Sequence, residues 1–184
     1  MAIGGVQPQK KQREKGRKAV MENQVKKSVF LIGFMGVGKS SITLELGHLL
    51  GLDTVEMDDY IVQQEGRSIS EIFDQDGEGY FRQVERAVVV TLGEGEPRVI
   101  SCGGGVPMGE ENRKNMKQYG TVVLLTARPE TIFQRVCHDQ NRPLLKDHMN
   151  VEYIASLMAQ RQPYYEQAAD VTVSTDGKTP AEIS

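Results

Sequence analysis

A chain of 184 residues with 39% hydrophobic residues is long enough to bury one core, so we expect a single domain. Its two cysteines, Cys102 and Cys137, lie far apart and follow no secretory leader, which argues against a disulfide framework or a Cys/His metal site and favours the cytoplasm. The sequence has no apolar run near the roughly 18 residues of a membrane span, so no membrane partner is expected.

The net charge of −3 conceals a basic N-terminal segment. Residues 1–27 carry eight Lys or Arg and two Glu, so this segment has a net charge of +6 and the remainder −9. Clustered cations can bind nucleic acid, but this segment has no aromatic residue to stack on bases and little apolar surface to bury. We therefore predict a disordered extension over 1–27, no nucleic-acid partner, and one domain over 28–184.

From Ser28 onward, short apolar runs alternate with helical patterns, which predicts an α/β domain with a mostly parallel sheet. Strands are expected at Val29–Ile32, Thr54–Met57, Arg98–Ser101, Thr121–Leu125 and Val171–Val173. Helices are expected to begin at Lys39, Asp59, Ile69, Glu78, Glu110, Pro129 and Val151. A capping box, Ser68 followed three residues later by Glu71, supports the helix that begins at Ile69.

The first expected strand leads into Gly33-Phe-Met-Gly-Val-Gly-Lys-Ser40, which matches every fixed position of G-x-x-x-x-G-K-[ST]. Such a loop turns its backbone N–H groups toward phosphate oxygens, and the following helix adds its positive end. Lys39 is predicted to reach the β- and γ-phosphates, and Ser40 to ligate Mg²⁺. The residues predicted to bind ATP in this loop are Gly33, Met35, Gly36, Val37, Gly38, Lys39, Ser40 and Ser41.

Motors, switches and small-molecule kinases share this loop, so the rest of the chain must distinguish them. The sequence contains no N-K-x-D, and Asp74-Gln-Asp-Gly77, which imitates a switch D-x-x-G, follows a helical stretch instead of a strand. A GTPase is therefore disfavoured, and a small-molecule kinase is favoured.

Two acidic residues, Glu56 and Asp58, lie at the end of the second expected strand. An extended segment would place both carboxylates on one side, in the crevice where α/β sheets bind ligands. Asp58 is predicted to take or orient the proton of an acceptor hydroxyl, and Glu56 to hold magnesium-bound water. A helix cap plus one solvated charge is the alternative.

A glycine run and three arginines are further candidates for binding the acceptor and the phosphates. Gly103-Gly-Gly105 follows the third expected strand, where glycines let the backbone approach a ligand; a flexible turn is the alternative. Arg82, Arg142 and Arg161 have the planar fork that suits a carboxylate or phosphate, although single arginines are often surface charges. The polar stretch 138–150 is predicted to form a lid that brings Arg142 onto the phosphates.

Taken together, these motifs resemble the shikimate kinases, which belong to the nucleoside monophosphate kinase-like P-loop proteins. The resemblance covers nearly all of the chain except the N-terminal segment. Besides the phosphate loop and the acid pair before Tyr60, it rests on Gly66-Arg-Ser-Ile-x-Glu-Ile-Phe73, Gly77-Glu-x-x-Phe-Arg-x-x-Glu85, Gly103-Gly-Gly105, Arg142-Pro-Leu-Leu and Arg161-x-Pro-x-Tyr165.

The resemblance implies a three-layer fold, with a five-stranded parallel sheet in the order 2-3-1-4-5 and a mobile lid. It implies ATP and shikimate as partners, Mg²⁺ as cofactor, and transfer of the γ-phosphoryl group to the 3-hydroxyl of shikimate, on the route to aromatic amino acids. By the same resemblance, Asp58 binds the acceptor hydroxyls and is the candidate base. The other implied roles are carboxylate binding for Arg82 and Arg161, pocket lining for Gly103, Gly104 and Gly105, phosphate contact for Arg142, and a place near adenine for Lys178 and Pro180.

The sequence departs from the family pattern at three places. Glu56 stands where aspartate is usual, Ser41 stands where threonine is common, and the chain stops at Ser184, where the family's last helix would begin. Two alternatives stay open from the residues alone: a kinase of another small hydroxy acid such as gluconate, and a nucleotide-binding module that has lost catalysis. A monomer is expected.

Overall fold

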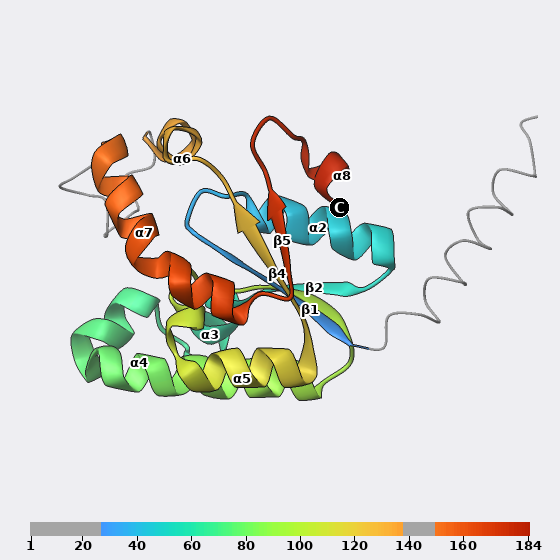
Figure 1. Cartoon of the computed structure of the whole chain (residues 1–184). Helices are drawn as coiled ribbons and strands as arrows, with labels where there is room; N and C mark the ends of the chain where they lie inside the picture. Colours follow the sequence, from blue (N-terminus) through green and yellow to red (C-terminus); the bar gives the residue numbers. More distant parts are fainter. Residues whose placement is uncertain (1–26, 138–149) are drawn as a thin grey trace, which may run out of the picture.

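A five-stranded parallel sheet forms the centre of the molecule (Figure 1). The computed structural model describes residues 27–137 and 150–184, so the predicted extension before Lys27 and nearly all of the predicted lid lie outside the described residues. The strands are β1 (Ser28–Gly33), β2 (Asp53–Glu56), β3 (Arg98–Ser101), β4 (Gly120–Thr126) and β5 (Val171–Ser174). Their order, β2-β3-β1-β4-β5, confirms the predicted order, and every neighbouring pair is parallel.

Helices cover both faces of this sheet. They are α2 (Lys39–Leu50), α3 (Met57–Glu65), α4 (Ile69–Glu94), the 3₁₀-helix η1 (Val106–Met108), α5 (Glu110–Tyr119), α6 (Pro129–Val136), α7 (Val151–Ala168) and α8 (Pro180–Ile183). Figure 1 shows α2 and α8 on one side of the sheet and α3, α4 and α5 on the other, which makes the three predicted layers. Across residues 27–137 and 150–184, no helix combines the length and apolar character needed to cross a bilayer.

Alternate residues of the central strands feed two separate cores. In β1, Phe30 and Ile32 pack with the core beneath α4 and α5, whereas Leu31 packs with the core beneath α2. β4 repeats this pattern, with Val122 in the first core and Leu125 in the second. Because successive strand side chains point to opposite faces, a strand covered on both faces needs a continuous apolar run, as these strands have.

The predicted helix starts are confirmed at Lys39, Ile69, Glu110, Pro129 and Val151. The capping box is also confirmed, since the Ser68 amide donates to Glu71 Oε2 at 2.7 Å and the Glu71 amide donates to Ser68 Oγ at 3.2 Å. The helix expected to begin at Glu78 is the second half of α4, which a backbone break at Gly77 (φ 79°, ψ 174°) separates from the first half.

The acid pair does not lie on one extended segment, so that prediction is wrong. β2 ends at Glu56, and Asp58 lies in the first turn of α3, which begins at Met57, before the predicted start at Asp59. The Met57 side chain is completely buried in the core and anchors this first turn. Asp58 and Asp59 then stabilise the positive end of the helix, which favours an early start.

Candidate active site

The phosphate loop connects β1 to α2, as predicted. Gly36 (φ 78°) and Gly38 (φ 97°) adopt left-handed backbone conformations that favour glycine. Gly38 is the N-cap of α2, no side chain caps the helix, and the first turn contains no acidic residue. The positive end of the helix dipole is therefore left for an anion bound in the loop.

Lys39 lies over this loop. Its Nζ atom donates hydrogen bonds to the carbonyl oxygens of Gly33 at 3.0 Å and Phe34 at 3.3 Å. Gly33 itself packs so closely on β4 that a Cβ atom there would collide with the Leu125 carbonyl oxygen. The strand end thus fixes the loop, and the loop holds the ammonium group where phosphates would bind.

Strand order brings the acidic residues to the same edge of the sheet. Glu56 is in register with Ser101 of β3, and Ser101 is in register with Leu31 of β1, which leads into the phosphate loop. The carboxyl ends of β2, β3 and β1 therefore meet at one crevice, where open α/β sheets bind ligands.

Asp58 lies against the first glycine of the loop after β3. A Cβ atom on Gly103 would be only 2.7 Å from Asp58 Oδ1, so only glycine lets the loop approach the carboxylate this closely. Burial raises the pKa of Asp58, and the nearby Lys39 ammonium partly opposes this shift. The Glu56 charge also raises this pKa, which makes Asp58 a stronger base than an exposed aspartate.

Arg82 reaches the third glycine of the same loop from α4. A Cβ atom on Gly105 would be 2.8 Å from Arg82 Nη1. Glu85 holds this guanidinium, since Arg82 Nη1 donates to its two carboxylate oxygens at 3.0 and 3.1 Å. Glu85 is buried, and that burial raises its pKa although Arg82 opposes the shift. Asn112 donates to Glu85 Oε2 at 3.4 Å and to the Val106 carbonyl at 3.0 Å, which ties this pair to η1.

Arg161 and Tyr165 of α7 face the middle glycine. A Cβ atom on Gly104 would be 3.7 Å from both Arg161 Nη1 and Tyr165 Oη. The Tyr165 hydroxyl donates to the Gly104 carbonyl at 2.8 Å, and the Arg161 guanidinium carbon lies 5.8 Å from the centroid of the Phe34 ring. The loop therefore has a different charged side chain beside each glycine: a carboxylate and two guanidinium groups.

A hollow of about 270 Å³ adjoins the outer side of the phosphate loop. Its lining comprises Val37, Gly38, Ser41, Ile42, Arg135, Thr175, Lys178, Pro180 and Ile183. The fold thus brings the loop before α8, predicted to lie near adenine, next to the phosphate loop. The hollow is continuous with the phosphate loop through shared residues, as a nucleoside site requires.

Arg135 of α6, which no sequence motif singles out, contacts the phosphate loop. Its Nη1 atom donates to the carbonyl oxygens of Gly36 at 3.2 Å and Val37 at 3.1 Å, and to Thr175 Oγ1 at 3.1 Å. In the sequence it is one cation in an ordinary helical pattern, so no local signal marks it. Arg142, the predicted lid arginine, lies outside the described residues.

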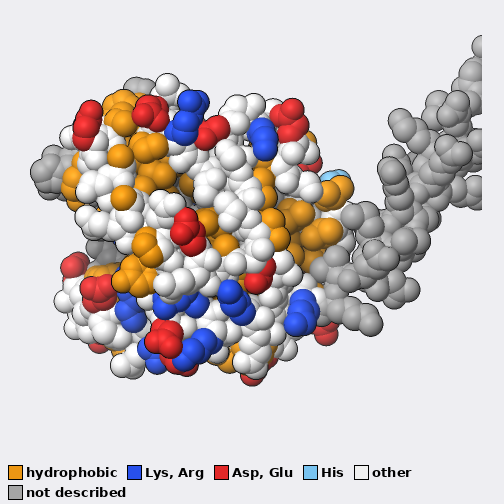
Figure 2. Space-filling model, in the orientation of Figure 1, with side chains coloured by type: hydrophobic (Ala, Val, Ile, Leu, Met, Phe, Trp, Pro, Cys, Tyr) orange, Lys and Arg blue, Asp and Glu red, His pale blue; other side chains and the backbone are white. Residues whose placement is uncertain are grey.

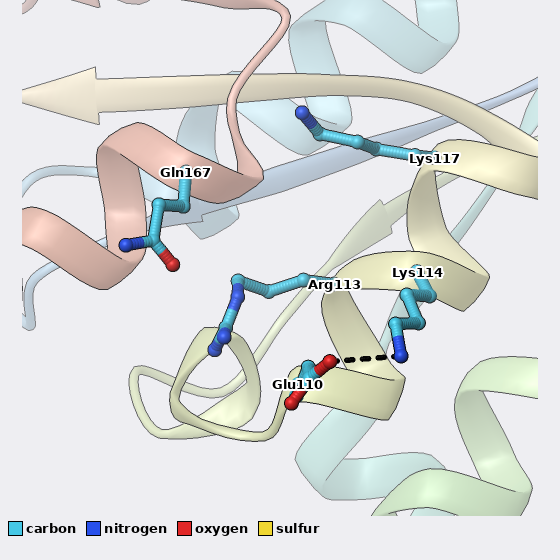
Figure 3. Close-up of a pocket in the computed structure, with 5 residues that line it drawn as sticks. All are labelled: Glu110, Arg113, Lys114, Lys117 and Gln167. Carbon is cyan, nitrogen blue, oxygen red and sulfur yellow. Dashed lines mark ion pairs between the residues drawn. The ribbon is translucent and has the colours of Figure 1, made fainter.

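A larger hollow of about 460 Å³ lies between α5 and α7 and contains none of the predicted site residues (Figure 3). Its lining comprises Glu110, Arg113, Lys114, Lys117 and Gln167, and Figure 2 shows Lys and Arg side chains gathered over α5 on this face. Lys114 pairs with Glu110 at 2.8 Å, and Arg113 Nη1 donates to the Pro107 and Met108 carbonyls at 2.7 and 3.0 Å. Arg113 therefore supports η1, and Lys114 supports the surface of α5.

The sequence matches the family described as "Shikimate kinase" over residues 35–184. A shikimate kinase from Persephonella marina is 40% identical over 157 residues, which cover 85% of this chain and 94% of the relative. The structure of a shikimate kinase from Acinetobacter baumannii in complex with shikimate has a TM-score of 0.81 at 32% identity, covering 90% of this chain and 91% of that chain. A gluconokinase from Sinorhizobium meliloti has a TM-score of 0.52 at 20% identity, covering 86% of this chain and 87% of that chain, so it shares the fold alone.

Proposed function

Because the chain belongs to the shikimate kinase family, we propose that it transfers the γ-phosphoryl group of ATP to the 3-hydroxyl group of shikimate, giving shikimate 3-phosphate and ADP. The observation that carries this proposal is the loop of three glycines, with Asp58, Arg161 and Arg82 beside Gly103, Gly104 and Gly105 respectively. A small acid with several hydroxyl groups needs cations for its carboxylate and an anion for its hydroxyls, and this loop offers both at close range.

The acceptor is held from two sides of the glycine loop. Arg82 and Arg161 bind the carboxylate, because a guanidinium group is a planar cation with several N–H donors. Glu85 keeps Arg82 in place through the hydrogen bonds described above. Glycines at 103–105 leave room for the ring of the acceptor next to the backbone.

Asp58 orients the 3-hydroxyl group and accepts its proton. Its raised pKa increases its basicity, while Lys39 and Arg82 nearby favour its ionised form. Lys39 stabilises the charge that develops on the transferring phosphoryl group, and Arg142 is proposed to contact the same phosphates from the lid. Catalysis then consists largely of positioning and of charge stabilisation, as is usual for phosphoryl transfer.

The oxygen donors at this edge of the sheet fit a magnesium ion that binds together with ATP. Within residues 27–137 and 150–184, no group of three or more His, Cys, Asp or Glu side chains could hold a metal unaided. Mg²⁺ usually keeps several waters and takes one or two protein ligands plus substrate phosphates. Ser40 would be a direct ligand of this ion and Glu56 would hold a bound water, and the ion would neutralise charge on the phosphates of ATP.

The adenosine end of ATP binds in the 270 Å³ hollow beside the phosphate loop. Lys178, shortly before α8, Pro180, the first residue of α8, and Arg135 of α6 line this hollow. Met35, Gly36 and Ser41 complete the nucleotide site through the loop itself. This arrangement keeps ATP on the α2 side of the crevice and the acceptor on the α4 side.

The cellular setting and assembly state are part of the same proposal. Both cysteines are free thiols, which supports a reducing compartment such as the cytoplasm. A monomer, with no nucleic-acid or membrane partner, stays a prediction.

Release of ADP from MgATP, measured with shikimate, with gluconate or without acceptor, tests the proposed reaction. We expect release that depends on shikimate alone. Release with gluconate but not with shikimate would assign a different acceptor. Binding of MgATP without release under any condition would identify a nucleotide-binding module without catalysis.

A further inference from the structure

Arg67 lies in the short connection between α3 and α4 and contacts both helices. Its Nη2 atom bonds Glu65 Oε2 at 3.2 Å, at the end of α3. Its Nη1 atom donates to Gln75 Oε1 at 2.9 Å, and its Nη2 atom pairs with the Asp76 carboxylate. Its guanidinium carbon also lies 5.6 Å from the centroid of the Tyr80 ring. One side chain therefore joins the end of α3 to residues on both sides of Gly77.

The break at Gly77 leaves the angle between the two halves of α4 dependent on contacts such as these. Gly77 has a left-handed φ of 79°, and a Cβ atom built on it would meet no heavy atom within 4 Å. Close packing at the glycine thus does not set the angle between the two halves of α4. Contacts on either side of the break help to set it, and the Tyr80 hydroxyl ties the second half of α4 to α3 by donating to Glu65 Oε2 at 3.1 Å.

The two segments joined by Arg67 carry opposite sides of the acceptor site. Asp58 lies in the first turn of α3, and Arg82 lies in the second half of α4, shortly after the break. A rotation of one segment against the other would move Asp58 relative to Arg82, and with them the binding sites for the hydroxyl groups and the carboxylate.

We propose that Arg67 is a positioning residue for the acceptor: it ties Glu65 of α3 to Gln75 and Asp76 just before the break and to the Tyr80 ring just after it. These contacts orient α3 against the second half of α4, and hence set the spacing of Asp58 and Arg82. This inference rests on the proposed function, because it concerns the acceptor of that reaction. Isolated surface ion pairs contribute little to stability, but a planar fork that contacts several partners at once defines a geometry. The Arg67 side chain is 24% exposed and does not line the nucleotide hollow, so we expect its replacement to affect the acceptor more than MgATP.

Steady-state kinetics of Arg67→Ala, with shikimate and MgATP varied in turn, tests this role. We expect the KM for shikimate to rise about tenfold, because small misplacements of binding groups weaken binding and catalysis strongly. The KM for MgATP should stay within about twofold of wild type, since the phosphate loop is untouched. Arg67→Lys keeps the charge but loses the planar fork, so it should recover only part of the shikimate affinity.

Lys114→Ala is the matched control, because Lys114 also bridges two surface carboxylates, Glu110 at 2.8 Å and Glu111 at 3.4 Å, but on α5. It should leave both Michaelis constants unchanged. An unchanged KM for shikimate in Arg67→Ala, or an equal rise in both constants, would overturn the positioning role while leaving the reaction intact. Wild-type protein that releases no ADP with shikimate would instead overturn the proposed function and this inference together.

Discussion

Replacing Gly103 by alanine would place a methyl group 2.7 Å from Asp58 Oδ1. Gly103 does not have a left-handed φ, so alanine can adopt its backbone conformation and the substitution tests space alone. Ordinary contact begins at 3.4 Å, so the carboxylate must move away by about 0.7 Å. Because a displacement near 1 Å can reduce the rate about 100-fold, we expect kcat/KM for shikimate to fall about 10- to 100-fold.

The assay is shikimate-dependent ADP release, together with the thermal midpoint of unfolding to confirm that the variant folds. Gly79→Ala is the matched control, since Gly79 also lacks a left-handed φ and a Cβ atom there would meet no heavy atom within 4 Å. This control should keep wild-type kinetics. A folded Gly103→Ala protein with kcat/KM within twofold of wild type would refute the close approach of the loop to Asp58, or the role of Asp58 in the reaction.

Three further substitutions test other parts of the site. Asp58→Asn should lower kcat by a factor on the order of 10²–10⁴ while shikimate still binds, and a kcat near the wild-type value would remove Asp58 as the base. Burial raises the pKa of Asp58, so its ionisation destabilises the ligand-free fold as the pH rises through that pKa. Asp58→Asn should therefore raise the thermal midpoint of unfolding at pH 7. This gain should vanish below the ordinary aspartate pKa of about 3.9, where Asp58 is protonated in both the folded and the unfolded state. Arg161→Ala should raise the KM for shikimate about 10- to 100-fold and spare the KM for MgATP; an unchanged shikimate KM would contradict carboxylate binding by Arg161. Arg135→Ala should instead raise the KM for MgATP about tenfold and spare the KM for shikimate, because it removes four hydrogen bonds that join the phosphate loop to Thr175. Equal increases in both Michaelis constants would argue against a role confined to the nucleotide.

Local patterns predicted the phosphate loop and most helix starts correctly, because these depend on neighbours in the chain. The loop motif needs only its own glycines, Lys39 and Ser40, and the capping box needs only Ser68 and Glu71. The predicted placement of Glu56 and Asp58 on one extended segment failed, because apolar and acidic residues at a strand end are compatible with either an extended segment or a helix. In the structure Met57 is buried in the core in the first turn of α3, and such burial depends on distant residues.

Arg135 and Arg67 show that sequence patterns do not identify contacts between residues far apart in the chain. Arg135 contacts the phosphate loop from a helix about 100 residues later in the sequence, with separations of 99 residues to Gly36 and 98 to Val37. Arg67 belongs to the family motif that ends at Phe73, but its partners Gln75, Asp76 and Tyr80 lie beyond that motif, on both sides of the break at Gly77. The residues next to an arginine in a helix or a connection do not reveal which distant groups it contacts.

The sequence by itself determined the alternation of strands and helices, the nucleotide loop and, through family resemblance, the reaction class, since each of these is written in residue types at short spacings. The tertiary structure decided which charged side chains meet. Parallel strand order placed the ends of β1, β2 and β3 at one crevice, and helix packing then brought Asp58, Arg161 and Arg82 to consecutive glycines. Contacts of this kind depend on the relative placement of whole elements, which comes from burying two cores on either side of the sheet.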